Sequence, residues 1–212
     1  MLKLEGKHGK DCKVFIDSVE DAALSTIYSI LDDEVSANVP VRIMPDTHEG
    51  VDIVIGFTMP ITDMVNPNHI GVDIGCGVTC GRIPKMEMSL AEIDERIRAA
   101  IPMGFAHRAS LHPFASENSE MEALAIKIGQ EPEAVYRQLG TLGGGNHFIE
   151  IGKSGEEWYI FVHTGSMNFG LQVCKYHAAK AKANGSKYLS GDDMKEYFDD
   201  MVVAQRFAAQ NR

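Results

Sequence analysis

Two histidines at the ends of a predicted hairpin are the first residues of this chain whose type and spacing suit chemistry. His147 and His163 flank the β-prone runs FIEI and WYIFV, and the turn sequence GKSGE joins these runs. A turn centred on Gly155 or on Ser154 puts both imidazoles on one face, whereas a centre between those residues separates them. Because the Gly-rich sequences LGGGN and TGS adjoin the histidines, we expect metal binding or catalysis. The alternative is a pair of hydrogen-bonded strand-end histidines.

An aspartate and a cysteine three residues apart form the second group. Asp73 and Cys76 lie in the glycine-rich sequence GVDIGCG, where a turn can point a carboxylate and a thiol at one ion. Carboxylates suit hard divalent metals and thiolates suit softer ones, and a thiolate can also bridge two ions. The alternative is a turn aspartate beside a small buried cysteine. Cys80, on the strand that follows, is expected to pack as a small hydrophobic residue.

Two further segments are candidates for substrate contact. The sequence MPDTHEG follows a predicted strand, so Asp46, His48 and Glu49 are either substrate contacts or ordinary turn residues. The sequence GTLGGGN is not a nucleotide-binding P-loop, because no Gly-Lys-Ser/Thr follows it. Its glycines nevertheless allow backbone amides to approach an anion closely.

The elements that must position these residues alternate between strands and helices. Strands are predicted at 13–16, 41–44, 53–57 and 78–83. Three helices are predicted to follow the caps Ser18, Ser89 and Ser116, and a fourth covers 171–184. A last helix begins at Asp192 and carries Met194, Phe198, Met201 and Val202 on one face. This order predicts an α+β fold, with mixed β-sheets and surrounding helices. Neither a repeat nor a linker is visible, so residues 1–212 are expected to form a single domain.

Composition and charge narrow the class of protein. Hydrophobic residues make up 44% and charged residues 24% of the chain, which is typical of a globular domain. The net charge of −10 argues against a protein that coats nucleic acid through its phosphates, unless a local basic patch or a metal ion supplies positive charge. The polar start of the chain and the absence of an apolar run of about 20 residues predict a cytoplasmic protein without a membrane span.

Four sequence blocks together resemble the RtcB family, the GTP-dependent RNA ligases that join 2′,3′-cyclic-phosphate or 3′-phosphate ends to 5′-hydroxyl ends. The blocks are MPDTHEG, GVDIGCGV, GTLGGGNHFIEI and HTGS, in that order, and the final AAQNR also resembles a helix of the family. They span residues 44–212. The resemblance therefore implies an RtcB-like fold whose N-terminal, metal-binding half is this chain, with the sequence ending before the C-terminal half.

The resemblance also implies roles for individual residues. By it, Asp73 and His147 bind one manganese ion, His163 binds a second, and Cys76 bridges the two. Asp46 and Cys76 take part in the ligation chemistry. The implied contacts to the guanine nucleotide are Asn146, His147, Phe148, Ile149 and Glu150. The implied cofactors are two Mn²⁺ ions, for which Zn²⁺ is a possible substitute, and GTP.

The sequence departs from the family in several places. NPNHI replaces a glycine-rich stretch before GVDIGCG, and MNFG follows HTGS where an arginine is common. The Ser-His-Gly block with the guanylylated histidine does not occur in the 212 residues. The implied partners are RNA ends, such as tRNA halves or broken RNA, and a C-terminal half supplied separately.

Two other functions remain open from the residues. One is a single-zinc hydrolase or phosphoesterase, in which one of the four candidate ligands stays off the metal to leave room for water. The other is a non-catalytic split or degenerate subunit.

Overall fold

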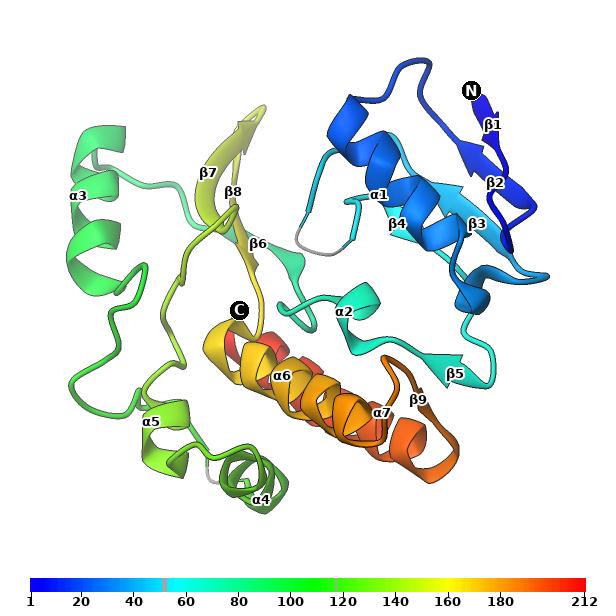
Figure 1. The fold of residues 1–212 in the computed structure, drawn as a ribbon. Coiled ribbons are helices and arrows are strands. Elements are labelled where there is room, and N and C mark those ends of the chain that lie inside the picture. The colour runs from blue at the N-terminus through cyan, green and yellow to red at the C-terminus, as the bar shows by residue number, and fades with distance from the viewer. Residues whose placement is uncertain (51–52, 117) are drawn as a thin grey trace. The chain divides into compact units, whose positions relative to one another are not determined.

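The structure, a computed structural model, describes residues 1–50, 53–116 and 118–212 (Figure 1). The chain forms two compact units, Met1–Gly71 with His177–Glu196 and Val72–Tyr176 with Tyr197–Arg212. Helices and strands of both units confirm the predicted α+β class, whereas the prediction of one RtcB-like domain stays a prediction. The elements are β1 (Leu2–Leu4), β2 (Asp11–Val14), α1 (Asp21–Leu31), η1 (Glu34–Ser36), β3 (Pro40–Ile43), β4 (Phe57–Thr58), β5 (Met64–Val65), α2 (Pro67–Ile70), β6 (Gly77–Ile83), α3 (Leu90–Ala100), α4 (Ser119–Lys127), α5 (Pro132–Tyr136), β7 (Phe148–Ser154), β8 (Glu157–Thr164), α6 (Met167–Ala183), β9 (Leu189–Ser190) and α7 (Gly191–Asn211).

The first unit is built on a four-stranded sheet in the order β1-β2-β3-β4. β2 and β3 pair in parallel, and β1 and β4 pair antiparallel to their neighbours. Alternate residues of β2 and β3 are buried, because one face of the sheet is covered by α1. Ile27 and Leu31 of α1 pack there with Val14, Val41 and Ile43, and all five are fully buried.

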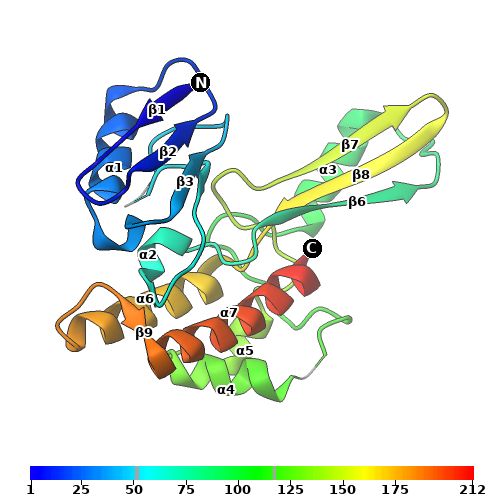
Figure 2. The same ribbon diagram turned by 90° about the vertical axis from the view of Figure 1, so that its right-hand side faces the viewer.

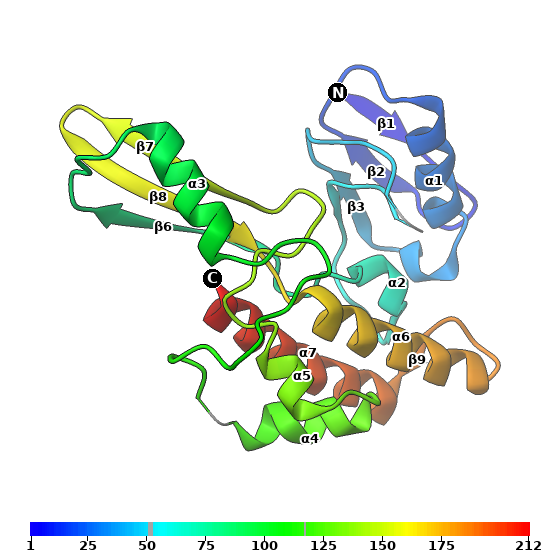
Figure 3. The ribbon, with the colours of Figure 1, turned by 90° about the vertical axis from the view of Figure 1, so that its left-hand side faces the viewer.

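The second unit carries a three-stranded antiparallel sheet in the order β6-β8-β7. Views from opposite sides show this sheet as a long ribbon, with α3 lying on one side of it (Figures 2 and 3). The cap predicted at Ser89 is confirmed and forms a capping box at the start of α3: Ser89 Oγ accepts from the backbone of Glu92, and Glu92 Oε2 accepts from the Ser89 amide at 2.8 Å.

Several element boundaries differ from the predictions. The helix expected from Ser116 begins at Ser119, because the Asn118 side chain accepts from two amides and is the actual cap. The helix expected from Ser18 begins at Asp21. The strand expected at 53–57 is mostly a turn, since Gly56 has a φ of 88° and only Phe57 lies in β4.

The two long helices also differ from expectation. α6 begins at Met167, four residues before the predicted start, and its first amide is bound by a distant side chain described below. The apolar face predicted for α7 is wrong in part, because Val202 is exposed and the buried residues include Ala204 and Phe207. Phe207 meets Phe169 of α6 with ring centroids 5.0 Å apart. No helix within the described ranges is both long enough and apolar enough to cross a membrane.

Candidate metal centre

Four predicted site residues converge within the second unit. Asp73 and Cys76 lie in the loop before β6, His147 lies just before β7, and His163 is the penultimate residue of β8. Cys76 Sγ is 3.2 Å from His163 Nε2 and 3.9 Å from His147 Nε2. One ligand atom from each of these three residues lies within 4.8 Å of the others, so the three atoms are close enough together to contact one ion.

The carboxylate of Asp73 lies beside this cluster and is tightly held. Its Oδ2 is 2.8 Å from His147 Nε2, and its Oδ1 accepts from the Met167 amide at 3.0 Å. The carboxylate thereby caps the start of α6, where the helix dipole favours a negative charge. Met167 has a φ of 50°, an uncommon conformation for a residue with a side chain, and the Asp73 contact helps to stabilise it.

Gly165 makes room for that carboxylate. A Cβ atom on Gly165 would overlap both carboxylate oxygens of Asp73. Because such contacts do not occur between real atoms, any larger residue at 165 requires Asp73 to move. The glycine of the sequence HTGS is therefore a steric requirement of the candidate site.

The ring of His147 is oriented by the loop before it. Its Nδ1 is 2.9 Å from the carbonyl oxygen of Leu142, so we infer that Nδ1–H donates to that oxygen. This tautomer leaves the Nε2 lone pair directed at Asp73 and Cys76, as metal ligation requires. The ring of His163 is instead held by stacking on Phe148, with centroids 5.3 Å apart and planes 9° apart.

The register of the hairpin was predicted wrongly, although the two histidines do meet. In the ladder Phe148 pairs with His163, and the two-residue turn is Gly155 and Glu156. This register would put residues 147 and 163 on opposite faces of a regular ladder. The imidazole rings still lie 5.6 Å apart, because His147 precedes β7 and its backbone is free of the strand alternation.

The thiol of Cys76 is strongly influenced by its surroundings. Although the residue reaches solvent, partial burial raises the pKa of its thiol to about 12, and the hydrogen bond and negative charge of Asp73 act in the same direction. The positive charge of Arg212 and the Gly77 amide oppose this rise. A bound divalent cation would reverse the balance, since a coordinating thiol loses its proton. The surroundings of Cys76 therefore favour the protonated thiol in the absence of a metal ion, and would favour the thiolate when a divalent ion is bound.

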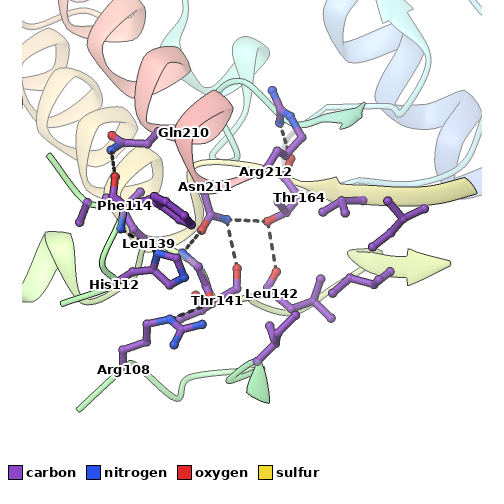
Figure 4. A pocket seen from close by; sticks show the side chains of 16 residues that line it. Arg108, His112, Phe114, Leu139, Thr141, Leu142, Thr164, Gln210, Asn211 and Arg212 are labelled. Carbon is purple, nitrogen blue, oxygen red and sulfur yellow. Dashed lines mark hydrogen bonds between the residues drawn. The ribbon is translucent and has the colours of Figure 1, made fainter. Parts of the chain in front are cut away.

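Two cavities adjoin the hairpin. One of about 560 Å³ is lined by Asp73, His147, Asn146, Phe105 and the 143–145 glycine loop. The second, of about 320 Å³, is lined by Ile149 and by Asn211 near the end of α7 (Figure 4). Only the first reaches the candidate metal ligands.

The residues predicted to contact a nucleotide do not share one surface. Asn146 and His147 line the larger cavity. Phe148 and Glu150 lie on the His163 face of β7, while Ile149 lies on the opposite face and lines the smaller cavity. Asp46 is exposed in the bend after β3 and belongs to the other unit, so its catalytic role stays a prediction.

The sequence did not identify every residue that contributes to this site. The prediction for Cys80, which lies outside the cluster, is wrong: it was expected to pack as a small hydrophobic residue but is exposed on β6. Thr164, Asn211 and Arg212 were given no role, yet they bind the loops that carry the ligands. Asn211 is the last residue of α7 and Arg212 follows it, and no local sequence pattern marked either residue as a partner of these loops.

Comparisons with known proteins agree in pointing to one family. Residues 35–128 and 114–212 match the family model described as tRNA-splicing ligase RtcB. The chain is 34% identical over 206 residues to the RNA-splicing ligase RtcB of Escherichia coli K12, covering 81% of the chain and 50% of that protein. It is 22% identical to the tRNA-splicing ligase RtcB of Methanococcus maripaludis, covering 80% and 49%. The chain thus spans about half the length of the curated relatives it matches.

Proposed function

Since the chain belongs to the RtcB family, we propose that it acts in RNA end joining and supplies the metal-binding half of a ligase. The observation that carries the proposal is the cluster formed by Cys76, His147 and His163. Asp73 adjoins the same cluster through His147. The proposed substrates are RNA ends, either tRNA halves or broken RNA, and the proposed nucleotide is GTP.

The donor chemistry supports a divalent ion in this position. Two imidazole nitrogens, a thiolate and a carboxylate suit Zn²⁺, and the carboxylate and imidazoles also suit Mn²⁺. Two Mn²⁺ ions bound there would supply positive charge to neutralise and orient a triphosphate. Asp73 would hold one carboxylate oxygen on the first amide of α6 and the other 2.8 Å from His147 Nε2, where an ion could be shared, and Gly165 leaves the carboxylate the space to do so.

The larger cavity beside the ligands is the proposed place for part of the nucleotide. Its wall includes the glycine loop at 143–145, and glycine amides can bind an anion without a bulky side chain intervening. Asn146 offers an amide group at the same wall. We propose that the guanylylated histidine comes from the Ser-His-Gly block implied by the family resemblance, whether in the same polypeptide or in another one.

A second function is favoured by one feature of the cluster. The three residues that fit a single ion leave Asp73 outside, which is the three-ligand arrangement of a catalytic zinc with an open position for water. A single-zinc hydrolase or phosphoesterase is therefore the alternative.

Counting bound metal per chain tests both functions. The purified chain would be equilibrated with Mn²⁺ or Zn²⁺, dialysed, and analysed by elemental mass spectrometry and calorimetry. Cys76→Ala should abolish or strongly weaken binding. Cys80→Ala is the matched control, because Cys80 is also exposed but lies outside the cluster, and it should bind like the wild type. Equal binding by Cys76→Ala and wild type would refute the metal site.

The number of ions separates the two candidates. Two Mn²⁺ ions per chain would support the ligase, and one tetrahedral zinc would support the hydrolase. Labelled GTP with Mn²⁺ gives a further test, because the chain alone should take up no label. A stable guanylyl label on one of its own histidines would contradict the proposed division of the active site.

A further inference from the structure

The end of α7 is bonded to the loop before β6, the loop before β7 and the end of β8, and Figure 4 shows its bonds to the last two segments. Asn211 is 9% exposed, and its side-chain amide donates to Thr164 Oγ1 and to the carbonyl oxygen of Thr141, both at 3.1 Å. Its side-chain oxygen accepts from the Gly140 amide at 2.8 Å. One buried side chain therefore links the loop before β7 to the end of β8.

Thr164 extends this connection to His147. Its hydroxyl is 3.2 Å from the carbonyl oxygen of Leu142, the same oxygen that faces His147 Nδ1. The hydroxyl and that ring nitrogen are themselves 3.4 Å apart. Because Asn211 donates to the hydroxyl, the threonine is free to donate its own proton to Leu142. The acceptor that sets the tautomer of His147 is thereby held in place from α7.

Arg212 links the other two ligands. Its Nη1 donates to the carbonyl oxygen of Gly75 at 2.7 Å and to that of Thr164 at 2.5 Å. Gly75 precedes Cys76, and Thr164 follows His163. A single guanidinium nitrogen thus bridges the backbone beside the thiol and the backbone beside the second imidazole.

We propose that Asn211 and Arg212 are positioning residues of the metal centre, which hold Cys76, His147 and His163 at ligand spacing from the end of α7. This inference rests on the proposed metal site. Neither side chain is placed to touch an ion. Both act through groups adjoining the ligands, and such outer partners commonly contribute roughly 10- to 100-fold to metal affinity.

Binding of Co²⁺ by the chain reports on the geometry of the metal centre, which a measurement of overall stability does not. A cysteine thiolate bound to Co²⁺ produces a charge-transfer absorption band, so the band reports whether Cys76 reaches the ion. Asn211→Asp is nearly isosteric and keeps the acceptor for Gly140, but it removes both donated bonds. Arg212→Ala removes the bridge, and Arg212→Lys keeps a cation that can donate to both carbonyl oxygens.

Matched controls lie on the same helix. Gln210→Ala changes a neighbouring side chain that contacts Phe114 and Ser116 instead of the ligand loops. Arg206→Ala removes an exposed arginine that pairs with Glu120. Thermal unfolding of each metal-free variant separates loss of affinity from loss of fold.

The expected result is a loss of Co²⁺ affinity of roughly 10- to 100-fold in Asn211→Asp and Arg212→Ala. Their charge-transfer bands should be weakened, Arg212→Lys should recover much of the binding, and both controls should match the wild type. Affinities within twofold of the wild type in Asn211→Asp and Arg212→Ala would overturn this inference but not the proposed metal site. If a variant does not fold, Thr164→Val decides by the same criteria, since it removes only the shared hydroxyl. A wild-type chain without Co²⁺ binding would overturn the metal site and this inference together.

Discussion

Replacement of Gly165 by alanine should weaken metal binding through steric displacement of Asp73. The added Cβ would overlap both oxygens of the carboxylate, so the carboxylate has to leave its contacts with Met167 and His147. A hydrogen bond to a charged group contributes about 1.5–3 kcal/mol. Because each 1.4 kcal/mol is a factor of ten, loss of one such contact predicts a roughly 10- to 140-fold weaker affinity.

Calorimetric titration with Zn²⁺ or Mn²⁺ measures this effect directly. Gly81→Ala is the matched control, since a Cβ there meets only Ile160 at an ordinary 3.6 Å. In Asp73→Ala the clash no longer exists, so adding Gly165→Ala to that variant should cause little further loss. Wild-type affinity in Gly165→Ala, or losses that simply add in the double variant, would refute the steric explanation.

Three further predictions follow from other parts of the structure. Because partial burial raises the pKa of the Cys76 thiol to about 12, metal binding near neutral pH must release its proton, and affinity should rise about tenfold per pH unit between pH 6 and 9. Calorimetry in buffers of different ionisation heat measures the release, and a wild-type affinity that is the same at pH 6 and pH 9 would contradict this prediction. Asn118→Ala removes the cap of α4 and should lower the free energy of unfolding by about 1 kcal/mol, as measured with urea, whereas Ser119→Ala should change it little. Ile27→Ala opens a cavity in the core under α1 and should cost about 2–5 kcal/mol, compared with a small change for the exposed Ile126→Ala.

The sequence predicted which side chains come together because each stands next to strong local signals, whereas their role as metal ligands stays a prediction. Glycine-rich turns adjoin Cys76, His147 and His163, and the β-prone runs predict the hairpin correctly. The sequence could not specify the exact register, because the centre of the observed turn, between Gly155 and Glu156, lies only half a residue from Gly155. The two imidazoles meet because of the loop that holds His147, and not because of the ladder.

Contacts between distant segments explain the remaining failures. The early start of α6 depends on the carboxylate of Asp73, which is 94 residues away from Met167 in the chain. The roles of Asn211 and Arg212 depend on carbonyl oxygens near residues 75, 141 and 164. No local pattern encodes such partners, because backbone carbonyl groups are the same at every position.

The bonds from the end of α7 have a consequence for the order in which this region matures during synthesis. All four candidate ligands leave the ribosome well before Asn211 and Arg212, which fasten their loops together. Early in translation the loops would therefore sample many arrangements, and a metal ion that met them then would encounter loosely held donors. Because the last turn of α7 brings these loops into their final arrangement, we expect that the proposed metal site forms only after this stretch of polypeptide has emerged.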